Sequence, residues 1–292
     1  MSEKSKKVFM SKMLTIFLAS MFLLSACNTI LTPTNEPTSL PVPSANSEPM
    51  DTATPVELAD TDTPPTETME PMVEKALEFS MNLNNLAERF QSEIIPAVSA
   101  SENPPYWLLM PEYTQISLEG YPVNQHRMQA KIYIYPVEEL VATNEGTGKV
   151  VETLQTLIQN PREIKDMPFL PLMNEVQVMH TQIQYLEFKT GQGLRYLTEF
   201  GQGIVPLNNY ELFYTFQGLT NDGKYYVAAI LPVNHPSLPV DIKITGNEPV
   251  EFSTDFPTYV KNIANSLNTQ SASSFTPDLS LLDTLISSLE IK

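Results

Sequence analysis

Two glycine-containing turns constrain the fold of this chain more than any other feature, because each lies between two long segments rich in apolar and β-branched residues. The first turn spans 189–193, and the second is Asn221-Asp222-Gly223. Asp-Gly between such segments is typical of a β-hairpin. We therefore expect two long antiparallel hairpins, with arms at 177–188, 193–201, 209–218 and 224–233.

The third of these arms carries apolar residues on both faces. Because side chains of a strand alternate, Tyr214 and Phe216 lie on one face and Phe213 lies on the other. A strand that is apolar on both faces is covered on both. This arm is therefore predicted to lie inside the sheet, under helices. The residues expected to share its first face are Tyr210, Leu212, Tyr214 and Phe216.

The segment 77–83 alternates apolar with polar residues, which indicates a half-buried strand. A helix that uses Phe79, Leu83, Leu86 and Phe90 fits the same residues, so both interpretations remain open. Shorter apolar segments predict three further strands, at 91–95, 113–118 and 129–135.

Pro136 suits the first turn of a helix, where its missing N–H costs nothing. This helix is predicted to end near Gln159, and Gly146 and Gly148 either loosen it or split it. The segment 167–173 contains two prolines and is expected to be a packed loop.

Two more helices are predicted to close the chain, at 254–267 and 277–289. The second has an apolar stripe that is expected to pack on the sheet. The stripe consists of Leu281, Leu282, Leu285 and Leu289. Together these elements predict one α+β domain over 73–292, a mainly antiparallel sheet covered by a mid-chain helix and C-terminal helices.

The N-terminus has the pattern of an export signal. Four lysines precede a short apolar run at 13–24, which has 12 residues and is too short for a membrane span of about 20. The run ends in Leu24-Ser25-Ala26-Cys27, which resembles the lipobox of bacterial lipoproteins. The resemblance implies cleavage before Cys27, a diacylglyceryl group on its sulfur, and an extracytoplasmic protein anchored to a bacterial membrane. A plain signal peptide with a chance cysteine is the alternative.

Residues 27–72 are predicted to form a lipid-anchored, disordered acidic linker. The part after Cys27 has nine prolines, ten threonines, eight acidic residues and no Lys or Arg. Such a composition cannot bury enough apolar surface to offset its ordering entropy. Without residues 1–26 the chain has 33 acidic and 13 basic residues, a net charge of −20. That charge excludes nucleic acid as a partner and leaves the acyl chains as the membrane grip.

The order of elements is similar to the PsbP-like fold. The similarity rests on the hairpin from Tyr214 to Val233 and on the closing helix before Ser287-Ser288-Leu289. The domain also resembles an uncharacterised family of exported lipoproteins that carry a segment like 214–220. The fold resemblance implies binding or assembly roles more than catalysis, and a fold alone does not fix function.

The sequence contains no catalytic or metal-binding signature. His126, His180 and His235 have no ligand spacing, and His126 and His235 are predicted to be solvated beside loops. A Gly-x-Ser-x-Gly nucleophile elbow is absent, and Gly191-x-Gly193 precedes a strand instead of a helix. No catalytic residue, metal or cofactor is therefore predicted.

Tyr106, Trp107 and Tyr121 form a candidate ligand-binding set. They lie in segments predicted to be loops, where aromatic rings can stack on a sugar or hold a peptide. The alternative is that Trp107 closes the edge of the core.

These features predict a membrane-anchored, non-catalytic binding or assembly module of the cell envelope, with an envelope protein or glycan as its partner. The alternative is a cell-envelope hydrolase that uses acidic residues on glycan or peptide. It requires two carboxylates about 5–10 Å apart in a cleft, with raised pKa values. A two-lobed solute-binding protein is disfavoured, because the domain is short for that class.

Overall fold

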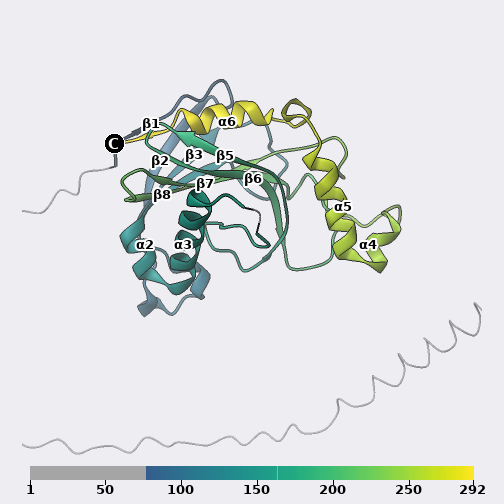
Figure 1. Ribbon diagram of the computed structural model, residues 1–292, viewed down its shortest axis with the longest axis horizontal. Helices are drawn as coiled ribbons and strands as arrows, with labels where there is room; N and C mark the ends of the chain where they lie inside the picture. Colours follow the sequence, from purple (N-terminus) through teal and green to yellow (C-terminus); the bar gives the residue numbers. More distant parts are fainter. Residues whose placement is uncertain (1–76, 163) are drawn as a thin grey trace, which may run out of the picture. The chain divides into compact units, whose positions relative to one another are not determined.

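The computed structural model describes residues 77–162 and 164–292, which belong to one compact unit. Its centre is an antiparallel sheet of seven strands in the order β2-β3-β4-β8-β7-β6-β5 (Figure 1). The predicted α+β class is confirmed. The predicted leader, linker and lipid site at Cys27 lie outside the described residues. The strands are β2 (Arg89–Ile95), β3 (Tyr113–Glu119), β4 (Lys131–Pro136), β5 (Val176–Phe188), β6 (Gly191–Gly201), β7 (Phe213–Thr220) and β8 (Tyr225–Pro232).

The hairpin of β5 and β6 has a shorter turn than predicted. β5 ends at Phe188 and β6 begins at Gly191, so only Lys189 and Thr190 connect them. Gly191 and Gly193 are strand residues. Glycine is required at these positions by close packing and not by a turn. A Cβ on Gly191 would lie 2.2 Å from the Leu219 carbonyl oxygen, and one on Gly193 would lie 2.2 Å from that of Gln217.

The hairpin of β7 and β8 is confirmed, but its first arm begins at Phe213 instead of 209. Asn208 holds residues 208–212, which come before this arm, in a turn. Its side-chain oxygen accepts from Tyr210 N at 2.9 Å, and its carbonyl oxygen accepts from Leu212 N at 3.1 Å. The prediction was therefore wrong for Tyr210, which is 40% exposed. All eight residues of β7 are buried, as expected for a strand that is covered on both faces.

The mid-chain helix is split, at Asn144 and not at a glycine. α2 (Val137–Thr143) ends directly before Asn144, and α3 (Glu145–Gln159) begins directly after it. The Asn144 side chain accepts from Thr147 N at 2.9 Å, which is the N-cap hydrogen bond that a new helix needs. Gly146 and Gly148 lie inside α3.

The chain closes with α4 (Val250–Thr254), α5 (Phe256–Asn268) and α6 (Leu279–Ser287), and α4 was not predicted. The predicted stripe on the last helix was wrong at Leu281, which is 44% exposed. The face that packs on the sheet consists of Leu279, Leu282, Leu285 and Ile286. Three short 3-10 helices complete the elements, at Ala100–Glu102, Tyr106–Leu108 and Ala272–Ser274.

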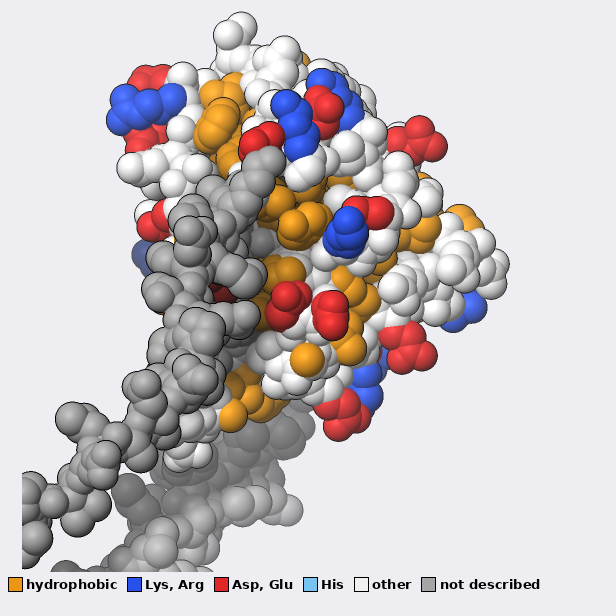
Figure 2. Space-filling view, turned by 90° about the vertical axis from the view of Figure 1, so that its left-hand side faces the viewer, with side chains coloured by type: hydrophobic (Ala, Val, Ile, Leu, Met, Phe, Trp, Pro, Cys, Tyr) orange, Lys and Arg blue, Asp and Glu red, His pale blue; other side chains and the backbone are white. Residues whose placement is uncertain are grey.

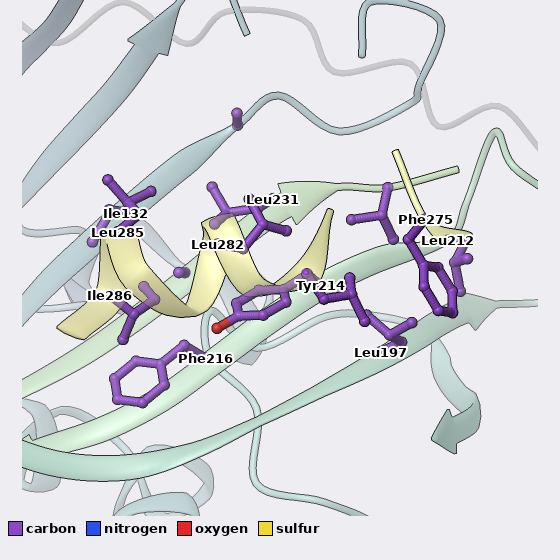
Figure 3. Packing of buried hydrophobic residues seen from close by; sticks show 14 of the residues in the cluster. Ile132, Leu197, Leu212, Tyr214, Phe216, Leu231, Phe275, Leu282, Leu285 and Ile286 are labelled. Atoms are coloured by element: carbon purple, nitrogen blue, oxygen red, sulfur yellow. The ribbon is translucent and has the colours of Figure 1, made fainter. Parts of the chain in front are cut away.

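Two apolar clusters cover the two faces of the sheet. Under α6, Tyr214, Phe216 and Leu231 pack against Leu282 and its neighbours (Figure 3). On the other face, α2 and α3 cover Tyr135, Tyr196 and their neighbours, together with the predicted packed loop 167–173. Asp283 of α6 also accepts from the Tyr214 hydroxyl at 3.0 Å and lies 3.2 Å from the Arg195 guanidinium.

The segment 77–83 forms a strand over two residues only, β1 (Phe79–Ser80), which pairs with β9 (Glu290–Ile291). The alternative helical interpretation was wrong. Asn84 and Asn85 both have positive φ angles, 47° and 62°, so the chain turns directly after this short strand.

Candidate functional site

A groove of about 730 Å³ lies between the first part of β5 and α5 (Phe256–Asn268). Five consecutive β5 residues, 176–180, line one side, and Phe256, Val260 and Ala264 of α5 line the other. Five consecutive lining residues show that the groove runs along β5, and residues 201–204 at the end of β6 also line it. We call it the β5 groove.

The position of α5 creates the β5 groove. The C-terminal part of α5 is bonded to the middle of β5: Thr181 Oγ1 donates to the Ala264 carbonyl at 2.8 Å, and Gln182 Nε2 donates to that of Leu267 at 2.8 Å. Gln182 has a φ of 56° and lies at an irregularity in the β5–β6 pairing. No described strand pairs with the outer side of β5, and the two hydrogen bonds named above join α5 to β5 at Thr181 and Gln182.

The surface of the β5 groove is apolar with charges beside it. Val176 and Ile204 are 69% and 61% exposed, which is unusual for large aliphatic side chains. Lys165, Lys261 and Asp166 also line the groove. Two cations and one acid make it locally positive in a chain whose net charge is −17.

A second hollow of about 440 Å³ continues from the β5 groove. The two share His180, Ala264 and Asn265. The second hollow is more polar, since Arg162 and Asn268 line it. The combined surface therefore runs along β5 from an apolar end to a polar end.

A charged cluster lies near the connection between β6 and β7. Arg127 donates to both carboxylate oxygens of Glu175, at 2.8 and 2.6 Å, and its Nε lies 3.8 Å from Glu211. Glu199 is 1% exposed and accepts from Asn208 N at 2.9 Å. The cluster holds residues 206–211 against the sheet.

Burial sets the protonation of these carboxyls. It raises the pKa of Glu199 well above 4.5, although the bond from Asn208 and the charge of Arg127 act in the opposite direction. Burial also raises the pKa of Glu211, again opposed by Arg127. A neutral Glu199 removes a buried charge from the cluster.

This cluster does not match the predicted hydrolase site. That site requires two carboxylates facing each other in a cleft, whereas neither Glu199 nor Glu211 lines either hollow described above. The geometry of the cluster instead explains how the connection between β6 and β7 is held.

The raised pKa of Glu199 predicts a specific pH dependence. Its folded pKa exceeds the unfolded one, so its contribution to stability is present below pH 4.5 and is lost as the pH rises through the raised value. Glu199→Gln is expected to flatten the fall in the free energy of unfolding above pH 4.5, measured by urea denaturation at a series of pH values.

Glu248→Gln is the control with the opposite sign. Hydrogen bonds from the backbone of Thr245 and Gly246 lower the pKa of Glu248, so its contribution is present above pH 4.5 and lost in acid. If both variants changed the pH dependence in the same direction, the assignment of Glu199 would be wrong.

The structure separates the predicted aromatic set. Tyr106 is 61% exposed, and its ring packs edge-on against Trp107 at 5.3 Å beside the junction of α2 and α3. Tyr121 packs against the cluster on the other face of the sheet, and its hydroxyl donates to the Pro232 carbonyl at 2.9 Å. Tyr106 and Trp107 are therefore together, and Tyr121 is not with them.

The prediction that His126 and His235 are solvated was wrong. His235 is 4% exposed, and its ring packs on Phe275 at 4.7 Å. His126 Nδ1 accepts from Met128 N at 2.9 Å, and its Nε2 lies 3.0 Å from the Leu212 carbonyl oxygen. Among residues 77–162 and 164–292, no three His, Cys, Asp or Glu side chains lie close enough to hold a metal.

The β5 groove could not be predicted from the sequence. Its walls come from segments separated by more than 50 residues, and it depends on where α5 diverges from β5. The alternation of Val176 and Val178 was visible, but exposure of Val176 could not be inferred from an apolar strand pattern.

No protein-family model, curated protein or solved structure matches the chain. The resemblances to the PsbP-like fold and to exported lipoproteins therefore remain predictions. In the described part of the chain, no helix combines the length and the apolar character needed to cross a bilayer.

Proposed function

We propose that this protein is a lipid-anchored, extracytoplasmic binding module of the bacterial cell envelope, and that the β5 groove binds an extended polypeptide segment of a partner protein. The lipobox at Leu24-Ser25-Ala26-Cys27 supports the anchoring and the location. The observation that carries the binding role is an apolar groove along β5, an edge strand with no described strand on its outer side.

Strand addition is the binding mode that this geometry favours. An extended peptide can pair with a free strand edge through its main chain, while alternate side chains enter neighbouring pockets. Exposed Val176 and Ile204 provide apolar contacts for those side chains. Lys165 and Lys261 favour a segment with acidic residues next to its apolar ones.

A short fluorescein-labelled peptide that alternates valine with glutamate provides the test. It is expected to bind the full chain saturably, measured by fluorescence anisotropy. Ile204→Asp is expected to weaken binding about tenfold, which corresponds to about 1.4 kcal/mol, because it places a charge in the apolar wall.

Ile244→Asp is the matched control, since Ile244 is 56% exposed, similar to Ile204, but does not line the β5 groove. A peptide with methylated backbone nitrogens is expected to bind weakly, because it cannot donate to the strand edge. Equal loss in both variants, or undiminished binding of the methylated peptide, would contradict strand addition in this groove.

A further inference from the structure

The other edge of the sheet, β2, is unusual because it is exposed on both faces. Six of its seven residues are exposed, including Phe90 at 38% and Ile94 at 56%. β2 pairs with β3 along its whole length, and no described strand pairs with its outer side. Figure 2 shows one side of the domain, where apolar side chains reach the surface between charged ones.

The hydrogen bonding of the sheet shows which β2 groups are free. Leu118 N donates to the Ala130 carbonyl, so the even-numbered residues of β3 bond toward β4 and the odd-numbered ones toward β2. In the β2–β3 register, odd-numbered residues lie opposite odd-numbered residues. The odd-numbered residues of β2 are therefore the ones that are hydrogen-bonded to β3. The backbone N–H and C=O groups of Phe90, Ser92 and Ile94 therefore point away from the sheet.

β2 lacks most of the features that normally prevent edge-to-edge pairing. Such edges are usually short, bulged or covered, or they carry proline or charged side chains, lysine above all. The charged residues of β2 are Arg89 and Glu93. β2 has seven residues, its register with β3 is continuous from Arg89 to Ile95, and it contains neither Lys nor Pro. At the opposite edge, α5 covers part of β5, so the two edges are not equivalent.

The sequence of β2 is complementary to itself in the antiparallel direction. A two-fold axis at Ser92 uses the full length of the strand and places Phe90 opposite Ile94 of the other copy. Gln91 then lies opposite Glu93, and Arg89 lies diagonal to Glu93, within reach of a long side chain. In this register the free backbone groups of residues 90, 92 and 94 face one another and can form hydrogen-bonded pairs.

We propose that two copies of this chain pair through β2, antiparallel about Ser92, so that their sheets join into one continuous sheet. This interface is separate from the β5 groove and leaves it open. The pairing satisfies the outward backbone groups and brings Phe90 of each copy against Ile94 of the other, which reduces the exposure of both side chains. A two-fold axis closes the assembly at two copies, because each chain then uses its only exposed β2 edge.

Ser92→Cys in the full chain, oxidised in intact envelopes, provides the test. Cα atoms of a hydrogen-bonded antiparallel pair are about 5.5 Å apart, within the range of about 4.4–6.8 Å that a disulfide spans. A covalent dimer is expected on non-reducing gels. Ile94→Cys is the matched control on the same strand and face, because its copies would be too far apart to bond.

Ser92→Cys is expected to give at least about tenfold more dimer than Ile94→Cys at equal oxidation time. The double variant Phe90→Cys with Ile94→Cys is expected to cross-link again, because these positions face each other. The unmodified chain, which has Cys27 alone, controls for that thiol. Equal cross-linking of the two single variants, or none in Ser92→Cys and the double variant, would overturn the proposal.

Discussion

Leu282→Ala is expected to lower the free energy of unfolding by about 3 kcal/mol. Leu282 is fully buried between α6 and the sheet, next to Tyr214 and Leu231 (Figure 3). Removing its side chain loses the transfer free energy of the apolar groups and leaves a cavity. The rigid strands beneath it cannot collapse to fill that cavity, because β7 and β8 are bonded on both sides.

Leu281→Ala is the matched control, with the same substitution one residue earlier in α6. Leu281 is 44% exposed, so its truncation is expected to change the free energy of unfolding by less than about 0.5 kcal/mol. Urea denaturation of the full-length variants measures both values. Similar values for the two substitutions would show that α6 presents a different face to the sheet.

Cys27→Ser is expected to release the protein from the membrane fraction. The thioether to diacylglycerol needs the Cys27 sulfur, and a hydroxyl cannot replace it in the lipobox chemistry that the sequence resembles. Several acyl chains hold a protein on a bilayer, whereas one chain gives only marginal binding. Most of the variant is therefore expected in the supernatant after envelopes are sedimented, and radiolabelled palmitate is expected to enter the unmodified protein only.

Asn28→Ser controls for this substitution, because it changes the next residue and leaves Leu24-Ser25-Ala26-Cys27 intact. It is expected to sediment with the envelopes and to incorporate palmitate. If Cys27→Ser sedimented as firmly as Asn28→Ser, the anchor would have to be something other than lipid on Cys27.

The sheet and its hairpins were predictable because their signals are local. Asp222-Gly223 fixes a tight turn between two apolar segments, and the double-sided apolar pattern of Phe213 and Tyr214 requires cover on both faces. The errors fell where tertiary packing decided the outcome. Gly191 signals a turn in sequence, yet it is a strand residue, and glycine is required there because the Leu219 carbonyl lies too close for a side chain.

The candidate site was much less predictable than the fold. The sequence predicts that Tyr106, Trp107 and Tyr121 lie in loops, but only the order of strands in the sheet decides which loops meet. Tyr121 lies on the opposite face, where its hydroxyl donates to the Pro232 carbonyl. The exposure of β2 was also hidden, since Phe90 and Ile94 in a short apolar segment predict burial, whereas β2 is an edge strand with six of its seven residues exposed.

The role of the β5 groove in binding is the central claim of this account. Hydrogen exchange of the full chain, with and without the valine–glutamate peptide, tests it most directly. Amides in 176–180 are expected to exchange at least about tenfold more slowly with the peptide bound, because new main-chain hydrogen bonds protect them. Unchanged exchange at 176–180 under saturating peptide, with protection elsewhere in the domain, would contradict it.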